Sequence, residues 1–227
     1  MVGPNDPSLP AAHSLLRGTF AKHELVSLRD WRDTLTERQA QIWTDSAWHL
    51  FVAERQGKVL GAATGTYLGN VNVGVIGYLT VDPSARRLGL GPRLRRRLKL
   101  AFQRDARNIQ GGELAGVVGE VRRDNPWLKV LIRRADVIAL DFPYFQPGLR
   151  PGERAVPLVL YYEGVGVQRK TLGGAELRRL LYTIWRRVYR MARPLTSKAF
   201  RRMIGELAKR RIVGELPLVR PKRAARR

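Results

Sequence analysis

Two glycines and an arginine stand between a β-branched run and a basic, leucine-bearing segment. Arg86, Gly89 and Gly91 have the spacing R-x-x-G-x-G, and the apolar run before them ends at Val81. This order predicts a strand, a glycine loop and the start of a helix. Such an arrangement binds phosphate, because glycines let the backbone approach an anion and the free N–H groups of the first helical turn point toward it. The helix dipole adds roughly half a positive charge at that end.

Two common phosphate-binding motifs do not fit this loop. The dinucleotide fingerprint G-x-G-x-x-G needs a third glycine, but Arg93 and Leu94 stand where it would fall. The Walker A motif needs Gly-Lys followed by Ser or Thr, which is absent here. The plain structural alternative is a glycine turn before an ordinary helix, since short motifs give false matches.

The longer pattern V-x-P-x-x-R-x-x-G-x-G, from Val81 to Gly91, resembles motif A of the GNAT superfamily of N-acetyltransferases. The strand before it and the helix after it match as well. The resemblance implies an acyl-CoA donor, most simply acetyl-CoA, with its pantetheine arm along the strand and its pyrophosphate at the loop. The donor-binding residues implied in this way are Leu79, Thr80, Val81, Arg86, Arg87, Leu88, Gly89, Leu90, Gly91 and Arg93.

A second stretch supports the same resemblance. A strand expected over residues 113–121 is followed by Asn125-Pro126 and a helix from Trp127 to about residue 135. Asparagine is a natural N-cap and proline a natural first helical residue, so capping alone would explain the pair. In the family the matching asparagine also contacts the pantetheine arm, and the resemblance gives Asn125 that role too.

The resemblance leaves the general acid and the general base open. The family's usual acid, a tyrosine, falls at Ile132, whose side chain cannot protonate a leaving thiolate. Tyr144 is the nearest substitute, with aromatic packing as its alternative. The strand expected over residues 71–81 carries no carboxylate, so Glu120 is the candidate base. Its alternatives are an ion pair with the arginines that follow it and a water chain to a backbone carbonyl. We expect Glu120 and Tyr144 to be the catalytic residues.

The elements around these motifs follow the order of an α/β fold of the GNAT type. The resemblance implies a mixed, mostly antiparallel sheet with helices on both faces, and N-terminal helices that border the acceptor side of the cleft. Ser27 and Asp30 predict a capped start for the second helix. We expect helices over residues 11–22, from residue 27, and over residues 92–107. We expect strands over residues 48–53, 59–68, 71–81, 113–121, 139–142 and 155–163. Residues 143–154 are expected to form an ordered loop or a flap.

The chain changes character after residue 163. Residues 164–227 hold 19 basic and three acidic residues, and their apolar positions predict helices over 173–191 and from Thr196 or Ser197 to about 211. The final PKRAARR is expected to be disordered. We therefore expect a GNAT acyltransferase domain over 1–163 and a basic helical extension over 164–227. The extension could pack over the sheet, shape the acceptor pocket or mediate a homodimer.

The composition limits the class of protein. The chain has 227 residues, a net charge of +23 and no cysteine, which excludes disulfides and thiolate metal sites and suits a cytoplasmic location. Its three histidines have no metal-ligand spacing. No apolar run approaches the roughly 18 residues that a membrane span needs. We expect neither a metal nor a membrane span.

Together these features predict an acyl-CoA-dependent N-acyltransferase in which a primary amine, small-molecule or peptide, attacks the acyl group directly, since no cysteine nucleophile exists. The positive charge leaves two alternatives. An acidic acyl carrier protein could be the donor, or nucleic acid could bind to a GNAT-like scaffold, although no known nucleic-acid-binding motif is present. The fold does not fix the acceptor, the acyl length or the oligomeric state.

Overall fold

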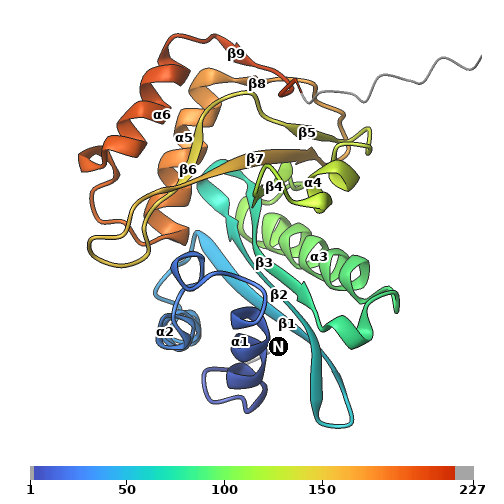
Figure 1. The fold of residues 1–227 in the computed structure, drawn as a ribbon. Helices are drawn as coiled ribbons and strands as arrows, with labels where there is room; N and C mark the ends of the chain where they lie inside the picture. The colour runs from blue at the N-terminus through green and yellow to red at the C-terminus, as the bar shows by residue number, and fades with distance from the viewer. Residues whose placement is uncertain (1–2, 218–227) are drawn as a thin grey trace, which may run out of the picture.

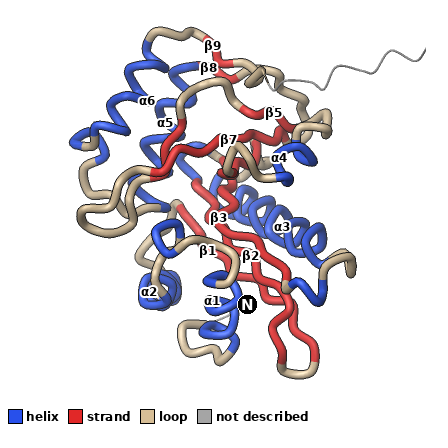
Figure 2. The backbone as a smooth tube through the Cα atoms, in the orientation of Figure 1, coloured by secondary structure: helices blue, strands red, loops and turns tan. Residues whose placement is uncertain are grey.

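A seven-stranded sheet with the order β1-β2-β3-β4-β7-β5, in which β6 also pairs with β7, forms the centre of the molecule (Figures 1 and 2). The computed structural model describes residues 3–217. Only β3 and β4 pair in parallel, so the sheet is mixed and mostly antiparallel, as predicted. The strands are β1 (Ser46–Arg55), β2 (Lys58–Leu68), β3 (Val73–Val81), β4 (Gly116–Val121), β5 (Val137–Ala139), β6 (Tyr144–Gln146) and β7 (Val156–Gly164).

Helices cover both faces of this sheet, which confirms the predicted fold class (Figure 1). Neighbouring strand residues point to opposite faces, so Val75 packs among the C-terminal helices while Ile76 packs against α3. Likewise Leu160 and Tyr161 of β7 join separate clusters. One face carries α1 (Ser8–Arg17), α2 (Leu28–Gln39), α5 (Gly174–Thr183) and α6 (Lys198–Ala208), and the other carries α3 (Leu90–Gln110) and α4 (Pro126–Leu131).

A capping box begins α2, as predicted, and a two-residue turn joins β1 to β2. Ser27 Oγ accepts a hydrogen bond from the Asp30 N–H at 3.1 Å, and the Asp30 carboxylate accepts one from the Ser27 N–H at 3.0 Å, which completes the capping box. The β1–β2 hairpin turns at Gln56 and Gly57, with φ of 52° and 74°. A left-handed backbone at both central positions is the requirement of the type I′ turn, one of the two common two-residue hairpin turns.

Several predicted boundaries are wrong, and β6 is the main omission. The expected loop over 143–154 begins with this strand, in which Tyr144 pairs with Leu158 and Gln146 with Val156. A three-residue strand is too short to show an alternating pattern, and β7 supplies its hydrogen bonds. The preceding strand is β5, over 137–139 rather than 139–142, and α4 ends at Leu131 rather than near residue 135. Helix α3 starts two residues earlier than expected, at Leu90.

The C-terminal extension shares a hydrophobic cluster with the sheet. Trp185, Phe200 and Leu207 are fully buried there, together with Val118 of β4 and Tyr162 of β7. The expected helix over 173–191 divides into α5 and a π-helical turn over Ile184–Val188. Strands β8 (Leu172–Gly173) and β9 (Ile212–Val213) pair at the far end. The division into a GNAT acyltransferase domain over 1–163 and an extension over 164–227 stays a prediction, and PKRAARR lies outside the described residues.

A buried ion pair joins α3 to β7. The Glu163 carboxylate is 0% exposed and accepts hydrogen bonds from Arg95 and Lys99 of α3, and from Arg134 at 2.9 Å. Burial alone would raise the pKa of Glu163, but the hydrogen bonds and charges of Arg95 and Lys99 outweigh it and lower that pKa. Its stabilising contribution is therefore fully present at neutral pH and is lost only as the pH falls through the lowered value.

We expect Glu163→Ala to lower the free energy of unfolding by about 3–5 kcal/mol, because it leaves Arg95, which is only 6% exposed, buried without its anion. Urea denaturation at neutral pH measures the change. Glu113→Ala is the matched control, since its ion pair with Arg107 is exposed and worth about 1 kcal/mol at most. Equal losses in the two variants would contradict the assigned role of the buried pair.

Candidate active site

Strands β3 and β4 pair over only four residues and then part. Their register runs from Val73 opposite Gly116 to Ile76 opposite Gly119. Beyond this point β3 stays paired with β2 and β4 with β7, so each strand follows its outer neighbour. The pairing of β2 with β3 shifts register at the same place: it advances two residues along β2, from Ala63 to Gly65, but three along β3, from Leu79 to Ile76. The result is a gap between the last residues of β3 and those of β4.

The β3 backbone presents unpaired N–H groups to this gap. The N–H groups of Tyr78 and Asp82 point toward β2, where they donate to Thr64 Oγ1 at 3.0 Å and to the Leu60 carbonyl at 2.9 Å. Alternate residues of a strand direct their N–H groups to opposite edges. The N–H groups of Leu79 and Val81 therefore face the gap, where β4 no longer accepts them.

The glycine loop leads directly from this gap into α3. Arg87 and Gly89 have left-handed backbones, with φ of 73° and 70°, and α3 begins at Leu90. The N–H groups of Leu90 and Gly91 lie in the first turn and so lack intrahelical partners. A Cβ on Gly91 would lie 3.8 Å from the Leu79 and Val81 side chains, which places the helix start beside the gap. Pro92, at the third helical position, offers no N–H.

A cavity of about 1390 Å³ extends from this gap to the opposite side of the sheet. The sequence-predicted residues divide into three groups by their position around it. Glu120 and six of the donor-binding residues line it, namely Leu79, Thr80, Val81, Arg86, Gly91 and Asn125. Another five belong to the same loop and first turn but lie outside the lining, namely Arg87, Leu88, Gly89, Leu90 and Arg93. Tyr144 is 1% exposed and lies behind the wall.

Asn125 performs the capping role that its sequence context suggests. Its Oδ1 accepts a hydrogen bond from the Trp127 N–H at 2.9 Å. Because Asn125 also lines the cavity, capping leaves its amide nitrogen available to a ligand. A contact with the pantetheine arm stays a prediction.

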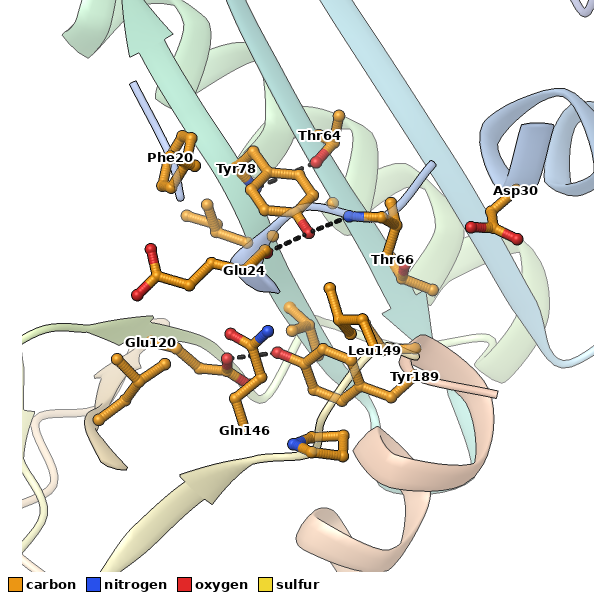
Figure 3. A pocket seen from close by; sticks show the side chains of 18 of the residues that line it. Phe20, Glu24, Asp30, Thr64, Thr66, Tyr78, Glu120, Gln146, Leu149 and Tyr189 are labelled. Carbon is orange, nitrogen blue, oxygen red and sulfur yellow. Dashed lines mark hydrogen bonds between the residues drawn. The ribbon is translucent and has the colours of Figure 1, made fainter. Parts of the chain in front are cut away.

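Segments far apart in the chain enclose the other end of the cavity (Figure 3). Residues 20–38 form one side, the loop over 147–153 a second and residues 186–192 of the extension a third. Hydrogen bonds hold these walls together: Arg150 donates to the Lys22 carbonyl at 2.9 Å, and Arg190 pairs with Glu37 at 2.7 Å. Of the roles left open for the extension, packing over the sheet and shaping this cavity are both observed.

Glu120 stands in the cavity wall between two tyrosines. Tyr144 donates a hydrogen bond to its Oε1. Tyr189 donates one to its Oε2, as Figure 3 shows. Burial raises the pKa of Glu120 by more than these two hydrogen bonds lower it. Burial also raises the pKa of both tyrosines well above 10.0, so they remain neutral donors at physiological pH.

Within residues 3–217, Glu120 has no arginine or lysine within ion-pair distance. The ion pair expected as its alternative role is absent, because Arg122 instead pairs with Glu24 at 3.1 Å and with Asp124 at 3.5 Å. Other carboxylates of the cavity have partners, such as Glu153 with Arg150 at 3.0 Å. Glu120 is therefore a half-buried carboxylate that lines the cavity without a counter-ion among the described residues.

Tyr189 is the functional candidate that the sequence did not reveal. It follows the π-helical turn after α5, lines the cavity and reaches Glu120, which lies 69 residues away in the chain. No local pattern marks it, because the contact depends on how the extension packs on the sheet. Ile132, the position of the family's usual acid, packs against the α4 cluster instead.

In the described part of the chain, His, Asp and Glu side chains form no group of three or more that could hold a metal ion. None of the helices found in residues 3–217 has the length and apolar character needed to cross a bilayer.

Comparisons with known proteins agree with this geometry. The profile described as the acetyltransferase (GNAT) family matches residues 12–125, which is half of the chain. Among curated proteins, none matches the sequence.

Two solved structures share the fold. A GNAT-family protein from Bacteroides thetaiotaomicron is 18% identical with a TM-score of 0.59, and the match covers 84% of this chain and 97% of that one. Ard1 from Thermoplasma volcanium is 14% identical with a TM-score of 0.50, over 72% of this chain and 95% of that one. At these identities the likeness concerns the fold alone.

We expect Tyr189→Phe and Tyr144→Phe each to raise the pKa of Glu120 further, because each removes a hydrogen bond that favours the charged carboxylate. An NMR titration of the ¹³C-labelled glutamate carboxyl groups measures this pKa. Tyr182→Phe is the control, since Tyr182 is 44% exposed on α5 and makes no contact with Glu120. An unchanged or lowered pKa in both of the first variants would contradict the arrangement.

Proposed function

This chain belongs to the acetyltransferase (GNAT) family, and we propose that it transfers an acyl group, most simply acetyl, from CoA to a primary amine by direct attack. One observation carries the proposal: the gap between β3 and β4 exposes backbone N–H groups and runs directly into the N-terminus of α3. An extended ligand with a phosphate group at one end fits such a site, since N–H groups follow its length and the helix start faces its anion.

At the donor end of the site, each free backbone N–H group has a proposed role in binding acyl-CoA. Acyl-CoA, when bound, supplies a thioester whose carbonyl carbon is open to attack. The N–H groups of Leu79 and Val81 would hold the pantetheine arm and polarise the thioester carbonyl. The N–H groups of Leu90 and Gly91 would hold the pyrophosphate, and Arg86, in the cavity lining, adds a positive charge beside it.

The acceptor end supplies the proton chemistry. Glu120 points to the same side of the sheet as the wall formed by residues 20–38, because Val118, two residues before it, packs on that side. An amine that enters from this side must lose a proton to attack. We assign Glu120 as the general base, and its raised pKa makes it a stronger base than an ordinary carboxylate.

The tyrosines complete this arrangement. Tyr144, behind the wall, fixes one carboxylate oxygen of Glu120, so we assign it a positioning role in catalysis. Tyr189 fixes the other oxygen and reaches the cavity, which makes it the phenol best placed to protonate the leaving thiolate. An acyl carrier protein as donor and a nucleic-acid partner stay predictions that rest on the charge of residues 164–227, as does a homodimer.

We expect Gly91→Glu to weaken CoA binding by roughly tenfold or more, because its carboxylate would repel the pyrophosphate. The helix should persist, since acidic side chains stabilise helix N-termini. A thermal-shift titration reports binding, with about 2.7 kcal/mol of stabilisation at 100 times the dissociation constant.

Gly91→Gln is the control for that variant, because it has the same size without the charge. Equal CoA affinity in the Glu variant and the wild type would contradict the donor site. Stabilisation by duplex DNA that weakens with salt, without a response to CoA, would instead favour the nucleic-acid alternative.

We expect Glu120→Gln to lower kcat/KM for amine acetylation by roughly 10²- to 10⁴-fold, the usual contribution of a positioned base. Wild-type kcat/KM should rise with pH through the raised pKa of Glu120, because only the deprotonated carboxylate accepts a proton. The variant should lose this dependence while it retains CoA affinity. A pH profile that is the same for both enzymes would show that another group is the base.

A further inference from the structure

Gln146, the last residue of β6, has a buried side chain with an unused hydrogen-bond donor. It is 5% exposed and lines the cavity (Figure 3). Its Nε2 is buried and has no hydrogen-bond partner among the described residues. Buried polar groups are nearly always paired, so an unpaired donor in a cavity wall is available to a molecule that enters the cavity. Within residues 3–217, the other unpaired buried side-chain atoms belong to His49, Arg95 and Trp185, which do not line the cavity.

The position of Gln146 relative to Glu120 follows from the strand. Residues two apart on a strand share a face and are separated by about 7 Å, so Gln146 lies on the same side of β6 as Tyr144. Tyr144 donates a hydrogen bond to the Glu120 carboxylate. The Gln146 carboxamide therefore belongs to the next residue on the same side of β6 as the one that contacts Glu120. Figure 3 shows Gln146, Glu120 and Tyr189 in the wall of the same cavity. A small molecule can therefore reach both groups.

The charges of the acceptor side indicate which ligand atoms suit these two groups. The arginines there already have partners: Arg187 pairs with Asp45 at 2.9 Å, Arg186 donates to the Ala192 carbonyl at 2.6 Å, and Arg190 and Arg150 pair with glutamates. Glu120 is anionic when deprotonated and lacks a counter-ion. This side therefore suits a ligand with a cationic or neutral amine and a neutral oxygen, and disfavours a ligand carboxylate.

Building on the proposed function, we propose that Gln146 is a specificity-determining residue for the acceptor. Its Nε2 donates a hydrogen bond to a carbonyl or hydroxyl oxygen of the acceptor while the acceptor's amine lies at Glu120. The substrate class is a primary amine with a neutral hydrogen-bond-accepting oxygen one or two carbons from the carbon that bears the amine. A 2-amino amide is the simplest probe of this class.

The test compares amines that differ only in this oxygen-bearing group. The pairs are phenylalaninamide with 2-phenylethylamine, and leucinamide with 3-methylbutylamine, with free phenylalanine as the anionic analogue. The wild type should acetylate each amide with a kcat/KM roughly tenfold or more above that of its partner, because a site built to hydrogen-bond a substrate group rejects analogues without it. Free phenylalanine should be a poor acceptor.

Gln146→Met should bring the ratio within each pair close to one, mainly by lowering kcat/KM for the amide. Comparison of the same ratio between enzymes removes the effect of amine basicity and of any general loss of activity. Gln103→Met is the matched control, since Gln103 lies on α3 outside the cavity and donates to the exposed Glu113. It should leave the ratio unchanged.

A second readout does not depend on turnover. Without ligand, Gln146→Met should melt at the same temperature as the wild type or higher, because it removes an unpaired buried donor. A clearly lower melting temperature would show that the carboxamide has a structural partner and would overturn the inference. So would an unchanged ratio in Gln146→Met, or acetylation without preference for the amides.

The same experiments separate this inference from the function on which it rests. The role of Gln146 alone is overturned if the protein binds CoA and acetylates these amines without preferring the oxygen-bearing member of each pair. It is also overturned if the protein binds CoA but acetylates none of these amines. Absence of both CoA binding and acetyl transfer overturns the proposed function, and the inference with it.

Discussion

The parting of β3 from β4 after four residue pairs is the constraint on which the site depends. A continuous sheet would satisfy every backbone group and leave no room for a ligand. Because each strand follows its outer neighbour instead, the N–H groups of Leu79 and Val81 face an open gap. The same β3 strand delivers the chain to the glycine loop and to the start of α3, so one backbone feature places both ends of the proposed donor site.

Two carboxylates, Glu163 in the core and Glu120 in the cavity wall, show how their surroundings assign different roles to one residue type. Glu163 pairs with Arg95, Lys99 and Arg134 and joins α3 to the sheet. The hydrogen bonds and charges of Arg95 and Lys99 lower its pKa. Glu120 has two phenols and, within the described residues, no cation, so burial raises its pKa. The first carboxylate is a fixed anion that stabilises the fold. The second can exchange a proton near the cavity, as a general base requires.

The sequence predicted those parts of the structure that depend on neighbours in the chain. The strand–loop–helix around Gly89, the capping box of Ser27 and the N-cap Asn125 act within a few residues, so their signals are local. The acceptor side was not predictable in this way. Tyr189 reaches Glu120 across 69 residues, and β6 exists because β7 pairs with it. Glu120 and Tyr144 appeared as two separate candidates, and only the folded chain shows that they are hydrogen-bonded to each other.

The central claim is that acyl-CoA lies in the β3–β4 gap with its pyrophosphate at the start of α3. Backbone ¹H–¹⁵N NMR spectra during a CoA titration test it most directly. The account predicts the largest shifts at the N–H groups of Leu79, Val81, Leu90 and Gly91, with slower hydrogen exchange at Leu79 and Val81. Tyr78, whose N–H already donates to Thr64, should keep its exchange rate. Shifts confined to residues 164–217, with none along β3, would contradict the account.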